Sequence, residues 1–569
     1  MATPLTESMP EHDTAPPAEP ELVLRPQISR RWALSAEHLL VVIVWGALFL
    51  FLSYLPLRAT DIWGHVAYGD WILQHRSLPA EDPFLPTAAG VPVVHSAWLS
   101  QVVFAATESL GGAEALSALF ALCVFAALVI LSRAFYLQSH RPLLALASAM
   151  IVLGVGWSRI GTIRPEIFSS LAFAVLLWMV VRTRQAGQNA ASNTPWWLWI
   201  GMAVMFAVWA NLHGSFVCGL VVLGCFALGR MSEVFLEQRS LRAALSDREG
   251  RRWLYLTELS LLATLVNPHG IDLHLYTLWF SSNENLRDVL EWKPLAFTGV
   301  GGREFVLSIA ALLIIWRRSR ARIPVAHGLL LAFFATLALS GIRMLSWYAP
   351  VYALVVTPHL ANIARQWFGP RRQIDPQRLP PAPTSNSEET PLQVWKYSLM
   401  ALLVIWISFA LSRVSRPLLG GDPPRQEVLL GEMTPIELTR YFRDHRPNGM
   451  IFNPQWFGDW LVWDGPEGIQ PFMTTNMHLA PRQVWKDYRH ILYARPGWRD
   501  VLYRYHIDTV VVDKDVPEGL EDVLRRDPFW KVIHEDSRAA VFVRKVSNEE
   551  AGPEAPADDD AGQSVEEQV

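Results

Sequence analysis

Apolar runs of membrane-spanning length recur along the first 412 residues, and they constrain the fold more than any other feature of the sequence. A hydrocarbon layer about 30 Å thick is crossed by roughly 17–25 helical residues. Runs close to this length lie at 36–56, 113–132, 142–158, 165–181, 196–211, 214–229, 253–267, 304–316, 325–341, 344–361 and 394–412. The chain is 51% hydrophobic and only 18% charged, below the roughly 25% of soluble domains. The sequence therefore predicts a mainly α, polytopic transmembrane helical bundle with about 11 spans.

The arginines beside these runs predict the orientation, because cytoplasmic loops are enriched in Lys and Arg. If the N-terminus is cytoplasmic, alternate loops bring most of these arginines to the same side, among them Arg133, Arg141, Arg182, Arg184, Arg230, Arg239, Arg317, Arg318, Arg365 and Arg371. The opposite loops hold far fewer basic residues over more positions. We therefore expect these opposite loops to face outwards, at 57–112, 157–164, 211–213, 268–303 and 342–343, together with the chain after the last span.

Composition divides the chain into six expected segments. They are a disordered cytoplasmic N-terminus (1–33), a transmembrane domain (34–369), a Pro-rich cytoplasmic linker (370–392), a last span (393–412), an extracytoplasmic soluble α/β domain (413–546) and an acidic disordered tail (547–569). Within the α/β domain, "GMIFN", "DTVVVD" and "AAVFVRK" predict strands. The stretches "PIELTRYFRDH", "PRQVWKDYRHIL" and "GWRDVLYRY" predict helices.

The first outer loop, 57–112, is too long for a simple connection. Ile62, Trp63 and Val66 recur at helical spacing, which predicts a helix lying on the membrane surface with Trp63 and Trp71 in the interface. The stretch "HSAWLSQVVFAATESLGG" predicts a second amphipathic helix that ends at Gly111.

Asp61 and His65 lie one turn apart on the first of these helices and share a face. A carboxylate at the outer membrane surface can act as a general base or as a metal ligand, and either role would activate a hydroxyl nucleophile. The same residue can also cap the helix, because Thr60 and Asp61 form an N-cap signal. The sequence leaves these roles open.

Glu81 and Asp82 form a second acidic pair in the same loop, with His95 nearby. Carboxylates and histidines suit a divalent cation, so Asp61, Glu81 and Asp82 are candidate metal ligands. Asp82 precedes Pro83, however, and is also an ordinary turn residue, which we favour.

Several cations lie on the outward face, where the orientation rule predicts few. They are accompanied by one acid, and the set is Arg159, Arg164, Glu166, Lys293, Arg303 and Arg343. A guanidinium fork matches the oxygens of a phosphate, so these residues are candidate binders of an anionic phosphate. Any single member can instead reach towards lipid headgroups.

"WANLHG" and "VNPHG" place Asn211 with His213, and Asn267 with His269, at the outer ends of two spans. These residues are candidate lining residues of an outward cavity, although Asn followed by Gly also ends helices. The sequence contains no Walker motif, no GxGxxG after a strand and no HExxH. We therefore expect neither a free nucleotide nor a nucleic acid as partner.

Six motifs occur in a fixed order: "TDIWGH", "AEDPF…HSAWLSQ", "RPEIFS", "WANLHG", "VNPHG" and "EWKP". In this order the chain resembles a group of bacterial multi-span proteins that are placed with the GT-C glycosyltransferases, which use polyprenyl-phosphate sugars. The resemblance covers about 34–365 and extends more loosely to the C-terminal domain. Where relatives often have Asp and Arg, this chain reads "TTNMH" (474–478).

The resemblance implies that Asp61 occupies the catalytic position of that superfamily, with His65 beside it. It also implies that the outer arginines bind the phosphate of a polyprenyl-phosphate sugar donor. A hexosyl or pentosyl group would pass to a glycan, lipid or protein of the cell envelope, at the outer face of the bacterial cytoplasmic (inner) membrane. The resemblance implies no cofactor, and the acidic residues Asp61, Glu81 and Asp82 leave a divalent cation as the one candidate. A lipid or glycan flippase and an inactive membrane scaffold remain alternatives, although we find no inverted repeat of the kind that transporters show.

Overall fold

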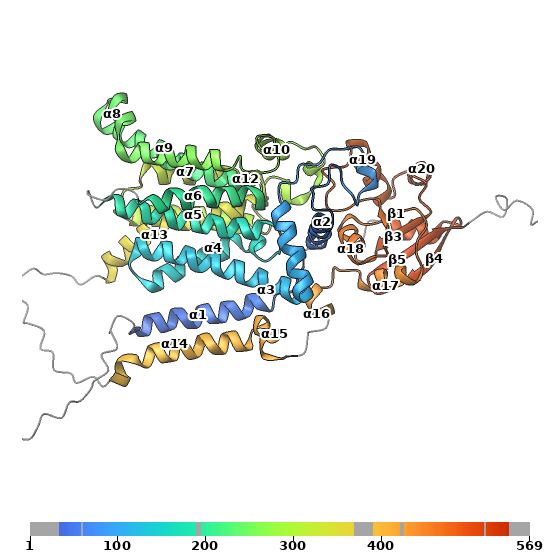
Figure 1. Cartoon of the computed structure of the whole chain (residues 1–569), viewed down its shortest axis with the longest axis horizontal. Coiled ribbons are helices and arrows are strands. Elements are labelled where there is room, and N and C mark those ends of the chain that lie inside the picture. Colours follow the sequence, from blue (N-terminus) through green and yellow to red (C-terminus); the bar gives the residue numbers. More distant parts are fainter. Residues whose placement is uncertain are drawn as a thin grey trace, which may run out of the picture.

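The computed structural model describes residues 33–58, 61–188, 195–368, 391–421, 426–516 and 519–545. The predicted N-terminal segment (all but residue 33), the linker 370–392 (all but its last two residues) and the tail 547–569 lie outside these ranges. The described chain forms a bundle of long helices, joined at one end to a smaller α/β part (Figure 1). The predicted fold class, a mainly α helical bundle followed by a C-terminal α/β domain, is therefore confirmed.

Each predicted apolar run coincides over most of its length with a helix of the bundle, although several runs extend past the helix end by one to four residues. These helices are α1 (Ala36–Ser53), α3 (Trp98–Ser139), α4 (Pro142–Ile160), α5 (Glu166–Gln188), α6 (Trp196–Leu212), α7 (Phe216–Gln238), α9 (Arg248–Ala263), α11 (Gly302–Arg318), α12 (Val325–Ser340), α13 (Leu345–Phe368) and α14 (Pro391–Leu411). In the described ranges, five of them are long and apolar enough to cross a membrane. A sixth span results if α14 is joined to the segment Arg413–Leu419, which bends by 73°. The number of crossings stays a prediction.

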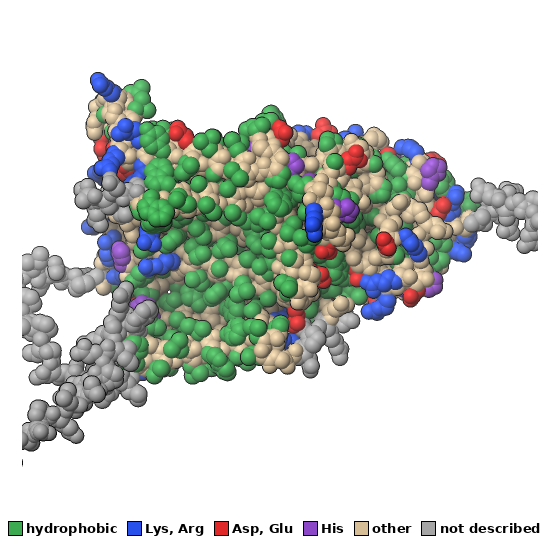
Figure 2. Space-filling view, in the orientation of Figure 1, with side chains coloured by type: hydrophobic (Ala, Val, Ile, Leu, Met, Phe, Trp, Pro, Cys, Tyr) green, Lys and Arg blue, Asp and Glu red, His purple; other side chains and the backbone are tan. Residues whose placement is uncertain are grey.

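The surface of the bundle agrees with a membrane environment. Figure 2 shows a broad band of hydrophobic side chains over the helices, with basic side chains gathered at the end where α8 (Leu241–Ser246) lies. Charged side chains of both signs cover the α/β part at the other end. Exposed apolar side chains on such a scale are stable in lipid and not in water. The chain is therefore an integral membrane protein.

Helix α3 combines two predicted elements. Its first part is the expected amphipathic helix of the outer loop, and its second part is the second apolar run. The two parts meet at Gly111 and Gly112, whose dihedral angles are not helical. Gly112 has φ +59° and ψ −153°, a region that is essentially restricted to glycine. The predicted end of the first helix at Gly111 is therefore confirmed.

Short elements connect the bundle at the end nearest the α/β part. They are α2 (Asp61–His75), η2 (Pro86–Ala88), α10 (Asp272–Phe280), η3 (Leu286–Asp288), η4 (Leu290–Trp292), η5 (Ile342–Met344), η6 (Arg413–Ser415), α15 (Arg416–Leu419) and α16 (Gln426–Leu430). The predicted helix at Ile62–Trp71 is present as α2, but its surroundings differ from the expectation. Trp63 is fully buried, and its ring lies 5.1 Å from that of Trp460 and 4.3 Å from that of Trp463. The expected interfacial position of Trp63 is therefore wrong, because the α/β part covers this face of α2.

The α/β part contains a five-stranded mixed sheet in the order β2-β1-β3-β5-β4. Its strands are β1 (Met450–Phe452), β2 (Gln470–Pro471), β3 (Thr509–Asp513), β4 (Trp530–Glu535) and β5 (Ala539–Arg544). Its helices are α17 (Ile436–Asp444), α18 (Gln455–Asp464), α19 (Arg482–Leu492), α20 (Trp498–Arg504) and α21 (Leu520–Arg526). The three predicted strands and three predicted helices are all present, and β2 and β4 are additional strands. Strand β1 pairs in parallel with β2 and β3, whereas β5 is antiparallel to β3 and β4.

Both faces of the central strand β3 are covered, as its continuous apolar sequence requires. Val510 and Val512 pack into one apolar cluster with Tyr488 of α19, while Val511 packs into another with Phe442 of α17. The loop between α10 and α11 also holds the α/β part against the bundle. The side-chain amide of Asn285 donates hydrogen bonds of 2.8 Å to the carbonyls of two residues in the segment after β2.

Candidate functional site

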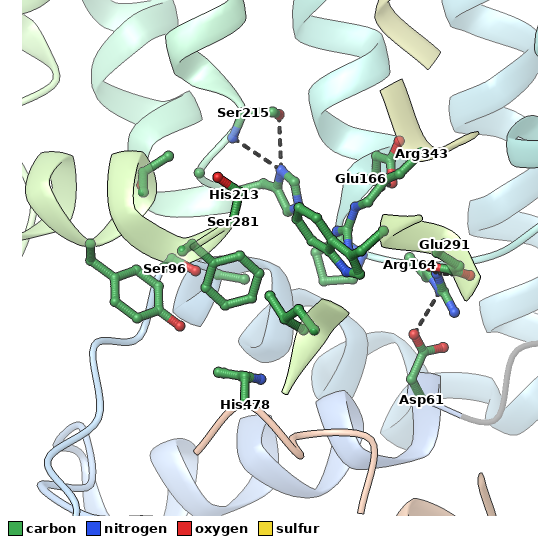
Figure 3. Close-up of a pocket in the computed structure, with 18 of the residues that line it drawn as sticks. Asp61, Ser96, Arg164, Glu166, His213, Ser215, Ser281, Glu291, Arg343 and His478 are labelled. Carbon is green, nitrogen blue, oxygen red and sulfur yellow. Dashed lines mark hydrogen bonds and ion pairs between the residues drawn. The ribbon is translucent and has the colours of Figure 1, made fainter. Parts of the chain in front are cut away.

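A cavity of about 810 Å³ lies between the end of the bundle and the α/β part. Its wall includes residues of α2, the start of α3, the turns before α5 and α7, η5 and the segment 475–479 that follows β2. Figure 3 shows Asp61 and His478 approaching the cavity from one side and Arg164, Glu166, His213 and Arg343 from the other. Segments far apart in the sequence therefore form one site.

Carboxylates and guanidinium groups alternate in one row of ion pairs beside this cavity. The members, in spatial order, are Asp61, Arg164, Glu291, Arg159, Glu166 and Arg343. Arg164 Nε lies 2.6 Å from Asp61 Oδ2, and Arg164 Nη1 donates to Glu291 Oε2 at 2.8 Å. The formal charges of the six groups cancel, so their burial leaves no net charge in the wall.

Glu291 holds two arginines at once. Its Oε1 lies 2.9 Å from Arg159 Nη1, and both its oxygens accept hydrogen bonds from Arg164 Nη1. Burial alone would raise the pKa of Glu291, but Arg164 and Arg159 outweigh burial and lower it to about 2. Burial likewise opposes the charge of Arg164, yet Asp61 and Glu291 raise its pKa above the ordinary value. These groups are therefore ionised at neutral pH and bound to each other.

Arg343 differs from the other two arginines. Its nearest acid is Glu166, at 3.8 Å from Nε, and within the described residues its guanidinium forms no hydrogen bond. It lies over the ring of Trp292, 5.2 Å from the centroid, and faces the cavity. Burial lowers its pKa, and Arg159 and Arg164 act in the same direction. Arg343 is thus the arginine whose donors remain available to an anion in the cavity.

Three histidines of the cavity are neutral at physiological pH. Burial lowers the pKa of His65, His213 and His478 to about 4 in each case, and nearby Arg343 acts in the same direction. The Nδ1 atom of His213 lies 2.9 Å from the Ser215 hydroxyl, which fixes the ring (Figure 3). Neutral imidazoles can each donate one hydrogen bond and accept another.

Tyr68 connects the outer loop to the α/β part at the cavity wall. Its hydroxyl donates to Asp82 Oδ2 and accepts a hydrogen bond of 3.0 Å from the Asn476 side-chain amide. Asp82 Oδ1 accepts from the backbone N–H groups of Phe84 and Leu85. Asp82 thus caps its own turn and positions Tyr68, which agrees with the turn role suggested by its sequence.

Several candidate residues do not reach the cavity. Asn211 accepts from the Trp98 indole at 2.8 Å and donates to two backbone carbonyls. His269 Nε2 accepts from the backbone N–H of His95 at 3.1 Å. Glu81 accepts from a backbone N–H in its own loop, and Lys293 is not part of the cavity wall. Asp61, His65, Arg164, Glu166, His213 and Arg343 do share the cavity, and Arg159 lies directly behind it.

The candidate metal ligands are not brought together. In the described ranges, no three His, Cys, Asp or Glu side chains are arranged so that they could hold a metal ion. Asp61 binds Arg164, whereas Glu81 and Asp82 are engaged by their own loop. The residues present therefore do not fit a metal shared by Asp61, Glu81 and Asp82.

Several residues of the site were not identified from the sequence. Glu291 belongs to the quoted "EWKP" motif, and three arginines on a base-poor face require acidic partners, so the signal for it was present. Gln101, Trp456 and Asn476 also line the cavity. Gln101 and Asn476 belong to the quoted stretches "HSAWLSQ" and "TTNMH", but neither stretch marks them as site residues. Trp456 and Asn476 reach the site only through the packing of the α/β part on the end of the bundle.

The fold and the site together define a polytopic membrane protein with a cavity, lined by apolar and charged side chains, between the helix bundle and the α/β part. No protein-family model and no curated protein matches the chain. Among solved structures, the chain is similar to the apo oligosaccharyltransferase of Archaeoglobus fulgidus, with 12% identity, a TM-score of 0.49, and coverage of 84% of this chain and 69% of that one. It is also similar to ArnT from Cupriavidus metallidurans bound to undecaprenyl phosphate, with 14% identity, a TM-score of 0.46, and coverage of 91% and 100%. At such identities and TM-scores these similarities assign no activity to the chain.

Proposed function

We propose that this protein is a membrane glycosyltransferase that moves a sugar from a polyprenyl-phosphate donor to an acceptor on the extracytoplasmic face. The observation that carries the proposal is the placement of Asp61 and Arg343 on one cavity at the end of the bundle. One group is a carboxylate with an oxygen free to accept a proton, and the other is a cation with donors free to bind a phosphate. The six sequence motifs of the GT-C resemblance support the same assignment.

In this mechanism Asp61 is the general base. Arg164 binds its Oδ2 and fixes the carboxylate, whereas Oδ1 has no hydrogen-bond partner among the described residues. The acceptor hydroxyl gives its proton to Oδ1 while its oxygen forms a bond to the anomeric carbon. The bond from that carbon to the phosphate oxygen breaks, and its electron pair leaves with the polyprenyl phosphate.

Arg343 would stabilise the charge that develops on this leaving phosphate, because a donor aimed at the growing charge lowers the barrier. Neutral His213 lies on its side of the cavity and His478 on the facing side, and both can donate further hydrogen bonds. His65, next to Asp61 on α2, would orient the acceptor hydroxyl. Arg159, Arg164, Glu166 and Glu291 would hold this arrangement in place.

The orientation belongs to the same proposal. The basic end of the bundle would be cytoplasmic, and the α/β part and the cavity would lie outside, at the inner membrane of a bacterium. There a lipid-linked donor replaces the nucleotide sugars of the cytoplasm, which agrees with the lack of nucleotide motifs in the sequence.

A transfer assay with the purified full-length protein tests the proposal. Radiolabelled polyprenyl-phosphate sugars would be incubated with the protein and an envelope extract as acceptor. We expect label to leave the lipid fraction in the wild type and to stay there in an Asp61→Asn variant. Movement of intact donor between leaflets of a vesicle, without cleavage, would instead establish a flippase.

A further inference from the structure

The cavity wall contains several buried oxygens that lack a hydrogen-bond partner. Among cavity-lining residues in the described part of the chain, these are Asp61 Oδ1, Gln101 Oε1, Glu166 Oε1 and Gln455 Oε1. One buried nitrogen, Arg164 Nε, also lacks a hydrogen bond of good geometry, but it forms an ion pair with Asp61 Oδ2 at 2.6 Å. Apart from the partly exposed guanidinium of Arg343, the unmet hydrogen-bonding capacity of the wall therefore consists of acceptors.

The two glutamines are the informative members of this group. Glu166 is already held by Arg159 and Arg343, and Asp61 belongs to the proposed catalytic step. Gln101 lies on α3, is only 8% exposed, and places its side-chain nitrogen 3.5 Å from His65 Nδ1. Gln455 begins α18 of the α/β part. Two neutral amide oxygens from separate parts of the chain thus face the same cavity.

Buried acceptors without partners are costly, so they indicate a ligand that supplies donors. A phosphate at neutral pH offers mainly acceptor oxygens and cannot satisfy them, which separates this region from the one around Arg343. A polyhydroxylated group can satisfy them, because each hydroxyl donates one hydrogen bond and still accepts others.

We propose that Gln101 and Gln455 form a subsite for the hydroxyl groups of a carbohydrate, and that they determine which sugar the cavity accepts. The identity of this ligand rests on the proposed glycosyl transfer. The subsite spans the junction between bundle and α/β part, so the α/β part contributes directly to sugar recognition. The departure at "TTNMH" fits this view, because Thr475 and Asn476 present neutral polar groups to the same cavity.

Saturation-transfer NMR on the full-length protein in detergent tests this subsite, with methyl hexosides, methyl pentosides and their monodeoxy analogues as probes. Gln101→Met and Gln455→Met remove the acceptor and keep the length of the side chain. Gln138→Met is the matched control, because Gln138 Oε1 is also buried and unpartnered, at the opposite end of α3 and away from the cavity.

We expect at least one glycoside to bind, its affinity to fall about tenfold in each of the two cavity variants, and no change in the control. A monodeoxy analogue that lacks the hydroxyl bound by one glutamine should bind the wild type more weakly than the parent glycoside does. The variant at that glutamine should show a smaller difference between the analogue and the parent glycoside. Equal binding by the wild type and both variants, or no glycoside binding by the wild type, would overturn the subsite.

A second measurement, the affinity for sugar-free polyprenyl phosphate, keeps the two proposals apart. We expect it to stay within about twofold of the wild type in the two glutamine variants, because the phosphate binds elsewhere. Glycoside binding without any affinity for polyprenyl phosphate would contradict the proposed donor and leave the subsite intact.

Discussion

Gly64 of α2 lies directly against Asp459 of α18, so closely that a β-carbon on Gly64 would be 2.1 Å from Asp459 Oδ1. Any other residue type at position 64 would force the Asp459 side chain to move or the two helices to separate. Asp459 is buried, and its Oδ2 accepts a hydrogen bond of 3.0 Å from the backbone N–H of Thr475, whose side chain lines the cavity. This contact therefore couples the packing of the α/β part to the shape of the site.

Burial raises the pKa of Asp459 to about 8, from an ordinary value of 3.8, with smaller contributions from Asp61 and Asp82. The folded state thus binds this proton more tightly than the unfolded state. The contribution of this proton to the free energy of unfolding is fully present below pH 3.8 and is lost as the pH rises through 8. We expect the melting temperature of the wild type to fall more between pH 5 and pH 9 than that of Asp459→Asn, by on the order of 5 °C. Parallel melting curves would show that the carboxyl is not buried in this way.

Asp61→Asn should reduce turnover by about 100-fold or more, because the amide cannot take the acceptor proton. Folding and donor binding should persist, since the shape of the side chain is kept. Asp70→Asn, on the same helix but outside the cavity wall, is the control and should leave turnover unchanged. A near-normal rate for Asp61→Asn would show that Asp61 acts only as a helix cap, because Asn caps a helix about as well as Asp does.

Arg343→Ala should weaken the binding of polyprenyl phosphate by about 10–100-fold, the usual scale for a lost charge-assisted hydrogen bond. Arg343→Lys should recover part of the affinity, because lysine keeps the positive charge but cannot bind two phosphate oxygens at once as a guanidinium does. The measurement is a titration of detergent-solubilised protein with the lipid, with exposed Arg303→Ala as control. Unchanged affinity in Arg343→Ala would place the phosphate elsewhere.

Glu291→Gln should have opposite effects on stability and on anion affinity. Loss of the carboxylate leaves Arg159 and Arg164 without their shared partner, so we expect about 1–3 kcal/mol of destabilisation. The freed arginines should also bind polyprenyl phosphate up to about tenfold more tightly. Glu284→Gln is the control, because Glu284 lies in the same loop, is exposed and, among the residues that the structure describes, forms an ion pair with Arg482 alone. A stable variant with unchanged affinity would show that Glu291 does not restrain these arginines.

The proposed orientation predicts which cysteines an impermeant thiol reagent can reach in intact cells. In a background without Cys123, Cys218 and Cys225, we expect Glu467→Cys in the α/β part to be labelled. Ser240→Cys, at the basic end of the bundle, should react only after the membrane is permeabilised. Labelling of Ser240→Cys in intact cells would show that the topology is the inverse of the proposed one, and it would contradict the lipid-linked donor that we propose.

The bundle could be predicted because the membrane imposes a strong and simple rule on sequence. A spanning helix must be apolar over its whole length, so each run was visible without knowledge of its neighbours. The break of α3 was also local, since two adjacent glycines mark it. In the α/β part, β4 was missed because Lys531, His534 and Glu535 interrupt its apolar pattern, as is common in an edge strand.

The environment of a helix face was harder to predict. Periodicity identified the apolar face of α2 but could not say whether lipid or protein covers it, and Trp63 proved to be covered by Trp460 and Trp463. The acidic partner of the arginines was missed for the same kind of reason. Glu291 meets Arg164 across 127 residues of sequence, and only the tertiary fold brings them together.

The break in α3 has a consequence for how far a ligand must travel. Gln101 lies on the part of the helix before Gly111 and Gly112, and the part after them belongs to the bundle. One continuous chain segment thus joins the cavity wall to a helix of the bundle. For the glycosyltransferase that we propose, this link would hold the cavity within reach of a headgroup whose lipid tail stays among the acyl chains, whereas a free sugar would gain nothing from it.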